Sequence, residues 1–416
     1  MEHFFYKENN LVAEGVPIAT VAEQYGTPCF IYSRAALEQG YGAYREAFDD
    51  HSHLICYAVK ANSNIAVLNV LAKLGAGFDI VSGGELARVI AAGGDPKKVT
   101  FSGLGKTTDE IRMGLDADIH CFNVESEAEL QRISDIAISE SKIAPVSIRV
   151  NPDVNAETHP YISTGLKENK FGISMEPAMQ LYVKASKMKG IRIAGIDFHI
   201  GSQLTNIRPI LNALDRILTM NDQLVAKGIT VDHVNIGGGL GVTYDDEKPP
   251  TPGELVSTIK RKFSGTDLKI VIEPGRSIAA NAGVLVTRVE YLKGHEGKNF
   301  AIVDGAMNDL IRPALYDAWQ NIVPVKKTEG SENLNYDVVG PICESADFLG
   351  KNRSLNIKPG DLLAVKSAGA YGFVMSSNYN SRLRAPELMI SKSNIHLIRE
   401  REVVPDLFRN EYLLPA

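Results

Sequence analysis

The chain has 416 residues, of which 44% are hydrophobic and 23% are charged, as in a globular protein rather than a fibrous or disordered one. Its 44 basic and 50 acidic residues give a formal net charge of −6, which provides no basic surface for nucleic acid or an anionic membrane. The sequence contains no run of about 18 apolar residues, so we expect no segment that spans a membrane.

The cysteines and the first residues indicate the compartment. The four cysteines are scattered with no C-x-x-C pair: Cys29, Cys56, Cys121 and Cys343. This pattern favours a reducing environment and argues against disulfides or structural zinc. Residues 1–8 lack the basic and apolar regions of a signal peptide, so we expect a cytoplasmic protein.

From about residue 53 to residue 280, apolar runs alternate with segments of helical periodicity. The expected strands are residues 54–59, 78–81, 99–102, 119–123, 146–150, 193–199, 233–236 and 269–272. Apolar residues at helical spacing lie between them, for example in 66–74 and 128–136. Eight strands with right-handed crossovers close more readily into a barrel than they form an open sheet. We therefore predict an α/β fold, a (β/α)8 TIM barrel over residues 33–283.

The pattern changes after residue 283. The apolar runs at 284–289, 301–303, 336–339 and 362–365 are short, and glycine and proline turns separate them. Only residues 310–320 read clearly as a helix. This indicates a second, mostly antiparallel β domain over residues 284–416. Residues 30–32 could add a strand to it, so residues 1–32 are assigned to the same domain.

Chemically unusual residues lie in, near the end of, or just after six of the expected barrel strands. They are Lys60, Asp79, Ser82, Arg149, His199, Ser202, the glycine cluster 237–241 and residues 273–277. In barrels of this type the active site lies at the C-terminal ends of the strands. One polar strand end is unremarkable, but six at one rim favour a site.

Lys60 ends an apolar run, and this position suggests its chemistry. Partial desolvation lowers the pKa of a lysine and frees a nucleophilic amine. Such an amine condenses with aldehydes, which makes pyridoxal phosphate the cofactor to test for. Taken alone, a lysine at a strand end is usually a solvated surface charge, so this interpretation depends on the other rim residues.

The cluster Gly237-Gly238-Gly239-Leu240-Gly241 is the expected phosphate site, because glycines let backbone N–H groups approach an anion after strand seven. Val242 breaks the G-x-G-x-x-G spacing of a dinucleotide fingerprint. Residues 103–108 imitate the end of a P-loop, but Thr100 stands where its first glycine is required. Nucleotide hydrolysis is rejected on that ground.

Glu273 and His199 fit a planar cofactor. A carboxylate at the end of an apolar strand needs a partner, and a protonated pyridine nitrogen would serve, making the ring a strong electron sink. His199, between Phe198 and Ile200, could lie flat against such a ring. A lone histidine in this setting is more often a core residue.

With these residues assembled, the chain resembles the fold-type III pyridoxal-phosphate decarboxylases over nearly its whole length. The resemblance is closest to the branch that converts meso-2,6-diaminopimelate to L-lysine and CO2 in lysine biosynthesis. The matching stretches are residues 57–62, 78–86, 151–165, 170–173, 199–203, 237–241, 273–277, 308–316, 343–347 and 369–380. Ten such matches in the same order exclude chance.

The resemblance implies a role for residues of both domains. Lys60 would hold pyridoxal 5'-phosphate as an internal aldimine, His199 would stack on its ring, and Cys343 would donate the proton that replaces CO2. Phosphate and ring nitrogen would be bound by Ser202, Gly238, Gly239, Glu273, Pro274, Gly275 and Arg276. The far end of the substrate would be held by Arg276, Arg312, Tyr316 and Glu344, with Tyr371 touching both cofactor and substrate.

The substrate assignment depends on Ser277 and Glu344. The ornithine branch typically has tyrosine after E-P-G-R and aspartate after the cysteine. Meso-diaminopimelate has a second amino-acid group, whose carboxylate suits Arg276 and Arg312 and whose ammonium suits Glu344. In the family Cys343 and Glu344 enter the site from the partner subunit, which implies a homodimer. Ala346 departs from the usual glycine, which leaves the fine substrate preference open but not the class of reaction.

Three alternatives stay open at this stage. A related decarboxylase could act on ornithine, arginine, lysine or carboxynorspermidine with the same chemistry. A non-catalytic cofactor carrier or pseudoenzyme is a second possibility, although Lys60, Cys343 and a β domain argue against it. Alanine racemase shares the architecture, but the acidic Glu273 favours decarboxylation.

Overall fold

The computed structural model describes residues 3–155, 170–295, 297–328 and 332–415. The chain divides into two compact units. The barrel unit comprises Glu38–Thr243 and Glu247–Ile278, and the β unit comprises Met1–Leu37, Tyr244–Asp246 and Ala279–Ala416.

The barrel unit contains the eight expected parallel strands: β5 (His53–Ala58), β6 (Gly77–Ile80), β7 (Val99–Phe101), β8 (Cys121–Val124), β9 (Ala144–Asn151), β11 (Ile191–Asp197), β12 (His233–Asn235) and β13 (Lys269–Ile272). Their order is β9-β11-β12-β13-β5-β6-β7-β8, and β8 pairs with β9 to close the ring. The short β10 (Ile173–Ser174) pairs with β9. The predicted closed barrel is confirmed.

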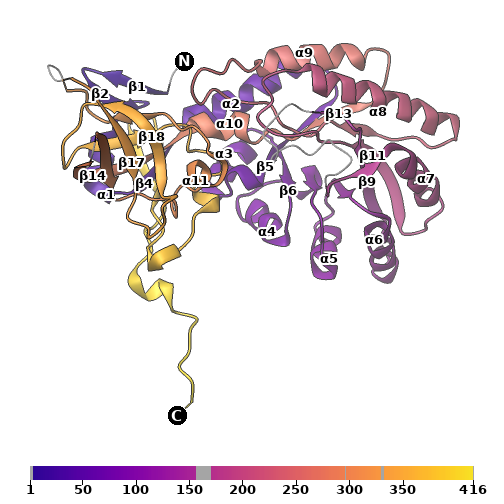
Figure 1. The fold of residues 1–416 in the computed structure, drawn as a ribbon. Helices are drawn as coiled ribbons and strands as arrows, with labels where there is room; N and C mark the ends of the chain where they lie inside the picture. Colours follow the sequence, from indigo (N-terminus) through magenta and orange to yellow (C-terminus); the bar gives the residue numbers. More distant parts are fainter. Residues whose placement is uncertain (1–2, 156–169, 296, 329–331, 416) are drawn as a thin grey trace. The chain divides into compact units, whose positions relative to one another are not determined.

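Helices lie outside the strands of this unit (Figure 1). They are α2 (Arg34–Phe48), α3 (Ile65–Lys73), α4 (Gly83–Ala91), α5 (Thr108–Asp116), α6 (Glu127–Ser139), α7 (Met175–Ala185), α8 (Arg208–Ala226) and α9 (Pro252–Lys262), with the short η1 (Val59–Ala61) and η2 (Pro96–Lys98). Side chains of Asn64, Ser82, Thr107, Ser126 and Thr251 accept hydrogen bonds from the first turns of α3, α4, α5, α6 and α9. These caps satisfy backbone N–H groups that the helix itself leaves without partners and therefore define where each helix begins.

Both faces of the barrel strands are buried, as expected when helices cover a parallel sheet. Phe78, Phe122, Ile148 and Ile196 are fully enclosed. A few polar residues are buried on the same strands, and they form the site described below.

The β unit is built around the long strand β14 (Gly283–His295). It pairs with β4 (Cys29–Ser33), β15 (Lys298–Val303) and β19 (Leu362–Val365), all antiparallel. The sheet continues through β16 (Ile322–Pro324), β17 (Leu334–Val339), β18 (Phe348–Leu355), β20 (Glu387–Ser391) and β21 (Asn394–Arg399). β4 confirms that residues 30–32 join this sheet. β15–β17 and β20–β4 are parallel pairs, so the sheet is mixed.

Smaller elements complete the β unit. The N-terminal strands β1 (Phe4–Lys7), β2 (Asn10–Ala13) and β3 (Val16–Pro17) form a separate three-stranded sheet, followed by α1 (Ile18–Tyr25). Short helices are α10 (Arg276–Ala279), which runs into this unit, α11 (Arg312–Tyr316), η4 (Ala280–Ala282), η5 (Phe373–Met375), η6 (Tyr379–Ser381) and η7 (Val404–Leu407).

The helix expected at 310–320 was too long. Only α11 forms there, because Pro313 occupies its first turn and Asp317 adopts a left-handed conformation (φ 49°) that ends it.

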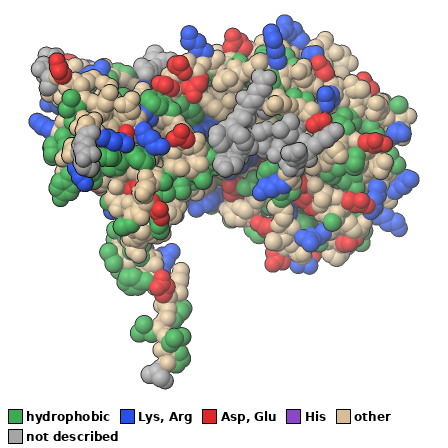
Figure 2. All heavy atoms as spheres, viewed as in Figure 1, with side chains coloured by type: hydrophobic (Ala, Val, Ile, Leu, Met, Phe, Trp, Pro, Cys, Tyr) green, Lys and Arg blue, Asp and Glu red, His purple; other side chains and the backbone are tan. Residues whose placement is uncertain are grey.

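The last residues of the β unit are exposed and apolar. Val403, Val404 and Phe408 are more than half exposed, and Tyr412, Leu413 and Leu414 are 92–98% exposed. Figure 2 shows these apolar side chains along the C-terminal segment. Among the described residues, no helix combines the length and the apolar character that a membrane span requires.

Candidate active site

Lys60 lies in η1, immediately after β5, and faces the next strand. Its Nζ donates to Oδ2 of Asp79 over 2.5 Å. Asp79, on β6, is fully buried, whereas the side chain of Lys60 is 42% exposed. The expected amine therefore stands at the mouth of the barrel as half of an ion pair, and it is less buried than its apolar strand suggested.

Glu273 follows β13, and three strands hydrogen-bond one of its oxygens. Its Oε1 accepts from Asn235 Nδ2 at 2.6 Å, from Thr100 Oγ1 at 3.1 Å and from Asn123 Nδ2 at 3.4 Å. These donors come from β12, β7 and β8. The carboxyl group is thus fixed in one orientation inside the barrel.

Burial, followed by the negative charge of Asp79, raises the pKa of Glu273 to about 7, although Lys60 and the bonds from Asn235 and Thr100 oppose the shift. Burial also raises the pKa of Asp197, at the end of β11, well above its ordinary value. Both carboxyl groups are therefore harder to ionise than exposed ones. A cationic partner near Glu273 would stabilise its ionised form.

Arg149, on β9, belongs to a separate ion pair. Its Nη1 donates to Glu125 Oε1 at 2.9 Å, and Glu125 Oε2 accepts from the backbone of Gly172 at 2.8 Å. The guanidinium lies over the ring of Phe171, 4.9 Å from its centroid. This pair anchors the end of β9.

His199 follows β11 and is held by the glycine turn. Its Nδ1 accepts from the backbone N–H of Gly238 at 3.3 Å, so the proton of the neutral ring lies on Nε2. Burial lowers the pKa of His199 to about 3, and the charges of Arg149 and Lys60 act in the same direction. The ring is therefore neutral at physiological pH and can pack flat against an aromatic ligand.

Gly238 and Gly239 allow three loops to approach one another backbone to backbone. A Cβ on Gly238 would lie 2.2 Å from the carbonyl oxygen of Glu273, and one on Gly239 would lie 2.3 Å from that of Gly201. Gly239 also has φ +109°, which L side chains rarely adopt. The glycines thus bring the loops after β11, β12 and β13 together.

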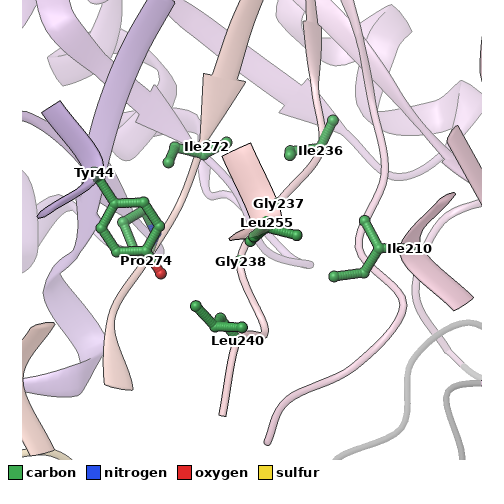
Figure 3. A pocket seen from close by; sticks show the side chains of 9 residues that line it. All are labelled: Tyr44, Ile210, Ile236, Gly237, Gly238, Leu240, Leu255, Ile272 and Pro274. Carbon is green, nitrogen blue, oxygen red and sulfur yellow. The ribbon is translucent and has the colours of Figure 1, made fainter. Parts of the chain in front are cut away.

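An apolar pocket lies beside this turn. It is lined by Tyr44, Ile210, Ile236, Gly237, Gly238, Leu240, Leu255, Ile272 and Pro274. Figure 3 shows the side chains of Ile236, Ile272 and Leu240 around the two glycines. Because these side chains offer almost no polar atoms, the polar groups of the turn are its backbone N–H groups.

The remaining predicted residues of the barrel unit lie on the same loops. Ser202 is half-buried three residues after His199. Pro274, Gly275 and Arg276 follow Glu273 and are buried, with Arg276 opening α10. A Cβ on Gly275 would come 3.0 Å from the Cβ of Ala58, next to the segment that carries Lys60.

The predicted residues of the β unit lie on loops and on α11. Arg312 is buried in α11 with its guanidinium over the ring of Tyr244, 4.6 Å from its centroid, and Tyr316 ends that helix. Tyr371 has φ +55°, an outlier for a bulky residue. Such strain is often found where side chains must point at a ligand.

Cys343 and Glu344 are exposed in the turn between β17 and β18. Cys343 is the one exposed thiol among the four cysteines, which all carry free thiols. The backbone N–H of Cys343 donates to Asn380 Oδ1 at 3.0 Å, and Tyr379 Oη hydrogen-bonds Glu344 Oε1.

Sequence reasoning did not identify Thr100, Asn123 and Asn235, nor Tyr379 and Asn380. The first three had a signal: each is a small polar residue between two apolar neighbours in the sequence. Residues 156–165 of the resemblance lie outside the described residues.

Comparisons with known proteins agree with this geometry. Residues 34–280 match the family model described as the pyridoxal binding domain of pyridoxal-dependent decarboxylases. A diaminopimelate decarboxylase of Pseudomonas aeruginosa is 57% identical over 415 residues, covering 100% of both chains.

Two solved structures are also similar. The diaminopimelate decarboxylase of Helicobacter pylori, in complex with L-lysine, is 42% identical with a TM-score of 0.91, covering 94% of this chain and 98% of that one. A diaminopimelate decarboxylase from M. jannaschi is 38% identical with a TM-score of 0.95, covering 99% and 98%. A barrel rim with a lysine, a buried carboxyl group and a glycine turn, together with full-length identity of this degree, shows that the chain belongs to the diaminopimelate decarboxylase family of pyridoxal-dependent enzymes.

Proposed function

We propose that this chain removes CO2 from meso-2,6-diaminopimelate to give L-lysine, with pyridoxal 5'-phosphate as cofactor. The observation that carries the proposal is the position of Lys60 and Glu273, both beside buried Asp79, at the mouth of one barrel. The full-length identity to diaminopimelate decarboxylases and the L-lysine complex of a relative support the substrate and the product.

The barrel residues fit pyridoxal phosphate in charge and shape. The cofactor needs an amine, a cradle for its phosphate, a flat wall and an anion for its ring nitrogen. Lys60, the turn at Gly238 and Gly239, neutral His199 and Glu273 match these four requirements. In addition, the buried Oδ1 of Asp79 has no hydrogen-bond partner among the described residues, which leaves acceptor capacity beside Lys60.

Lys60 would hold the cofactor through its Nζ, and the same amine, beside Asp79, would hold or move a proton. When bound, pyridoxal phosphate withdraws the electron pair that remains after CO2 leaves. Glu273, held in position by Asn235, would keep a proton at the ring nitrogen. His199 would pack on the ring face and exclude water.

Residues of the β unit, with Arg276 of the barrel unit, are proposed to act on the substrate. The distal carboxylate binds Arg276 and Arg312, and the distal ammonium binds Glu344, each as a charge-assisted contact. Tyr316 and Tyr371 complete the substrate site. The Sγ of Cys343 delivers the proton that takes the place of the lost carboxylate.

We further propose that the working unit is a homodimer in the cytoplasm, in which Cys343 and Glu344 serve the partner's barrel. Both side chains are exposed in this chain, as a role outside it requires. The exposed apolar residues between Val403 and Leu414 are a second surface suited to self-association. The four free thiols suit a reducing compartment.

The test of function measures CO2 release by the purified chain with pyridoxal phosphate and each of five amino acids: meso-diaminopimelate, ornithine, arginine, lysine and carboxynorspermidine. We expect turnover of the first alone, with L-lysine as product. Absence of activity on meso-diaminopimelate, or faster turnover of another substrate, would contradict the assignment.

A second measurement tests the cofactor site directly. Borohydride reduction of the loaded protein should bleach its absorbance and attach the cofactor irreversibly to the peptide that contains Lys60. Attachment at a different lysine would remove the basis for the proposed site.

A further inference from the structure

The turn that carries Cys343 and Glu344 is held by two neighbouring residues from a distant part of the chain. The side-chain carbonyl of Asn380 accepts the backbone N–H of Cys343 at 3.0 Å. The hydroxyl of Tyr379 hydrogen-bonds one oxygen of Glu344. One dipeptide therefore contacts both residues to which the proposed function gives chemical roles.

The segment that presents this dipeptide is itself anchored. Asn378 Nδ2 donates to Glu402 Oε2 at 2.6 Å and to the carbonyl of Arg382 at 2.9 Å. The backbone N–H of Ser377 donates to the carbonyl of Asn308 at 2.9 Å. Tyr379 and Asn380 are thus fixed from both directions along the chain.

The backbone of Asn380 is suited to this task. It has φ 55° and ψ 28° within η6, a left-handed conformation that asparagine tolerates better than most residues. This conformation aims the amide oxygen at the N–H of Cys343. Alanine would lose the acceptor and also strain the backbone, whereas glycine would lose the acceptor alone.

Asp347 holds the other end of the same turn. Its Oδ2 accepts from the backbone N–H of Ile342 at 2.8 Å, and its Oδ1 accepts from that of Met307 at 2.7 Å. Asp347 is buried, whereas Cys343, Glu344, Tyr379 and Asn380 are exposed. The buried carboxylate of Asp347 fixes the base of the turn, and Tyr379 and Asn380 fix its exposed tip.

We propose that Tyr379 and Asn380 are positioning residues for the decarboxylation: Asn380 sets the thiol of Cys343 for proton delivery, and Tyr379 orients Glu344 toward the distal ammonium of the substrate. This rests on the proposed function. Tyr379 donates to Oε1 of Glu344, which leaves Oε2 to accept from the ammonium. Asn380 should affect kcat, because Cys343 acts in a chemical step. Tyr379 should affect KM, because Glu344 acts in substrate binding.

The test compares variants in the holoenzyme with meso-diaminopimelate. Tyr379→Phe should raise KM about fivefold or more with little change in kcat, since a hydrogen bond to a charged group is lost. Tyr291→Phe, at an exposed tyrosine of β14, is the matched control. Asn380→Gly should lower kcat about fivefold, with KM nearly unchanged. Asn380→Asp, which keeps an acceptor, should recover most of kcat.

A second readout does not depend on turnover. Cys343 is the exposed thiol of the chain, so its iodoacetamide alkylation rate, followed by peptide mass spectrometry, reports how the turn is held. Asn380→Gly should change this rate several-fold, and Asn380→Asp should restore it. Equal thermal midpoints would show that all variants fold.

Two results would overturn the inference. If Asn380→Gly has the same kcat as the parent, Asn380 does not position Cys343. If the KM of Tyr379→Phe changes no more than that of Tyr291→Phe, Tyr379 does not position Glu344. If the parent chain releases no CO2 from meso-diaminopimelate, the proposed function has failed instead. The alkylation rates then still decide whether Asn380 holds the turn.

Discussion

Asn235, the last residue of β12, donates a 2.6 Å hydrogen bond to Glu273, which directly follows the neighbouring barrel strand β13. The bond fixes the carboxyl group that is proposed to face the ring nitrogen, and it opposes the rise in the pKa of that carboxyl group. A strand-end asparagine therefore controls how readily a buried acid ionises.

Removing that donor should change the pH dependence of catalysis. In Asn235→Ala, the pKa of Glu273 rises further above its present value of about 7, so more of it is protonated at neutral pH. The acid limb of the kcat profile should move to higher pH, with activity partly recovered at pH 8 to 9. If kcat is lower at every pH but the acid limb does not move, Asn235 does not act through Glu273.

Lys60→Ala should abolish the absorbance of the bound cofactor and most turnover, because no other amine is proposed to bind the aldehyde. Lys73→Ala, at the exposed end of α3, is the control and should keep both. Spectra and CO2 release measured side by side decide the matter. A Lys60 variant that retained both would refute this assignment.

Arg276→Ala should weaken substrate binding while the cofactor stays attached. Loss of one charge-assisted contact, worth about 1.5–3 kcal/mol, predicts a rise in KM of about tenfold or more. The absorbance spectrum monitors the cofactor in the same samples. An unchanged KM would place the distal carboxylate elsewhere.

Acid should destabilise the fold through buried histidines. Burial lowers the pKa of His233 to about 3, and its Nε2 lies 3.1 Å from Ser147 Oγ. Below the ordinary pKa of 6.5 the unfolded chain takes up a proton that folded His233 does not. The free energy of unfolding therefore falls as the pH drops from 6.5 toward 3, by up to about 1.4 kcal/mol per pH unit for one group.

His233→Asn tests this effect, because asparagine does not titrate. We expect the variant to be less stable than the parent at pH 8, with a deficit that shrinks between pH 6.5 and 5. Thermal midpoints across this range measure it. A deficit independent of pH would show that His233 titrates normally.

Shortening the chain after Asp406 should weaken self-association, since it removes the exposed Phe408, Tyr412, Leu413 and Leu414. Sedimentation velocity at several concentrations measures the shift toward monomer. Replacing the polar Arg409 and Asn410 with serine is the control. A truncated chain that associates as strongly as the parent would exclude this segment from the interface.

The strands of the barrel were predictable because buried parallel strands read as apolar runs, and all eight formed. The helix expected at residues 310–320 was predicted too long, because Asp317 adopts a left-handed conformation that ends the helix. Lys60 and Asp79 were expected at one rim because each lies near a strand end, but their ion pair was not predicted. By contrast, the donors to Glu273 depend on closure of the barrel, which brings Thr100 and Asn235 to one point from segments 135 residues apart.

The turn at Cys343 shows the same limit at longer range. Asn380 is 37 residues away, and nothing in local periodicity indicates that a left-handed residue there will accept its N–H. Resemblance named Cys343 and Glu344 but not the residues that hold them. Such partners emerge only from coordinates.

The backbone-to-backbone contact at Gly238 and Gly239 constrains how this protein can change over generations. A side chain at either position would collide with the backbone carbonyl of Glu273 or of Gly201, so no single substitution there leads gradually to a different anion cradle. Glu344 and Tyr379 are exposed, so many single substitutions can be accommodated at these two positions. Descendants of this chain could therefore acquire new amino-acid substrates while inheriting the cradle untouched.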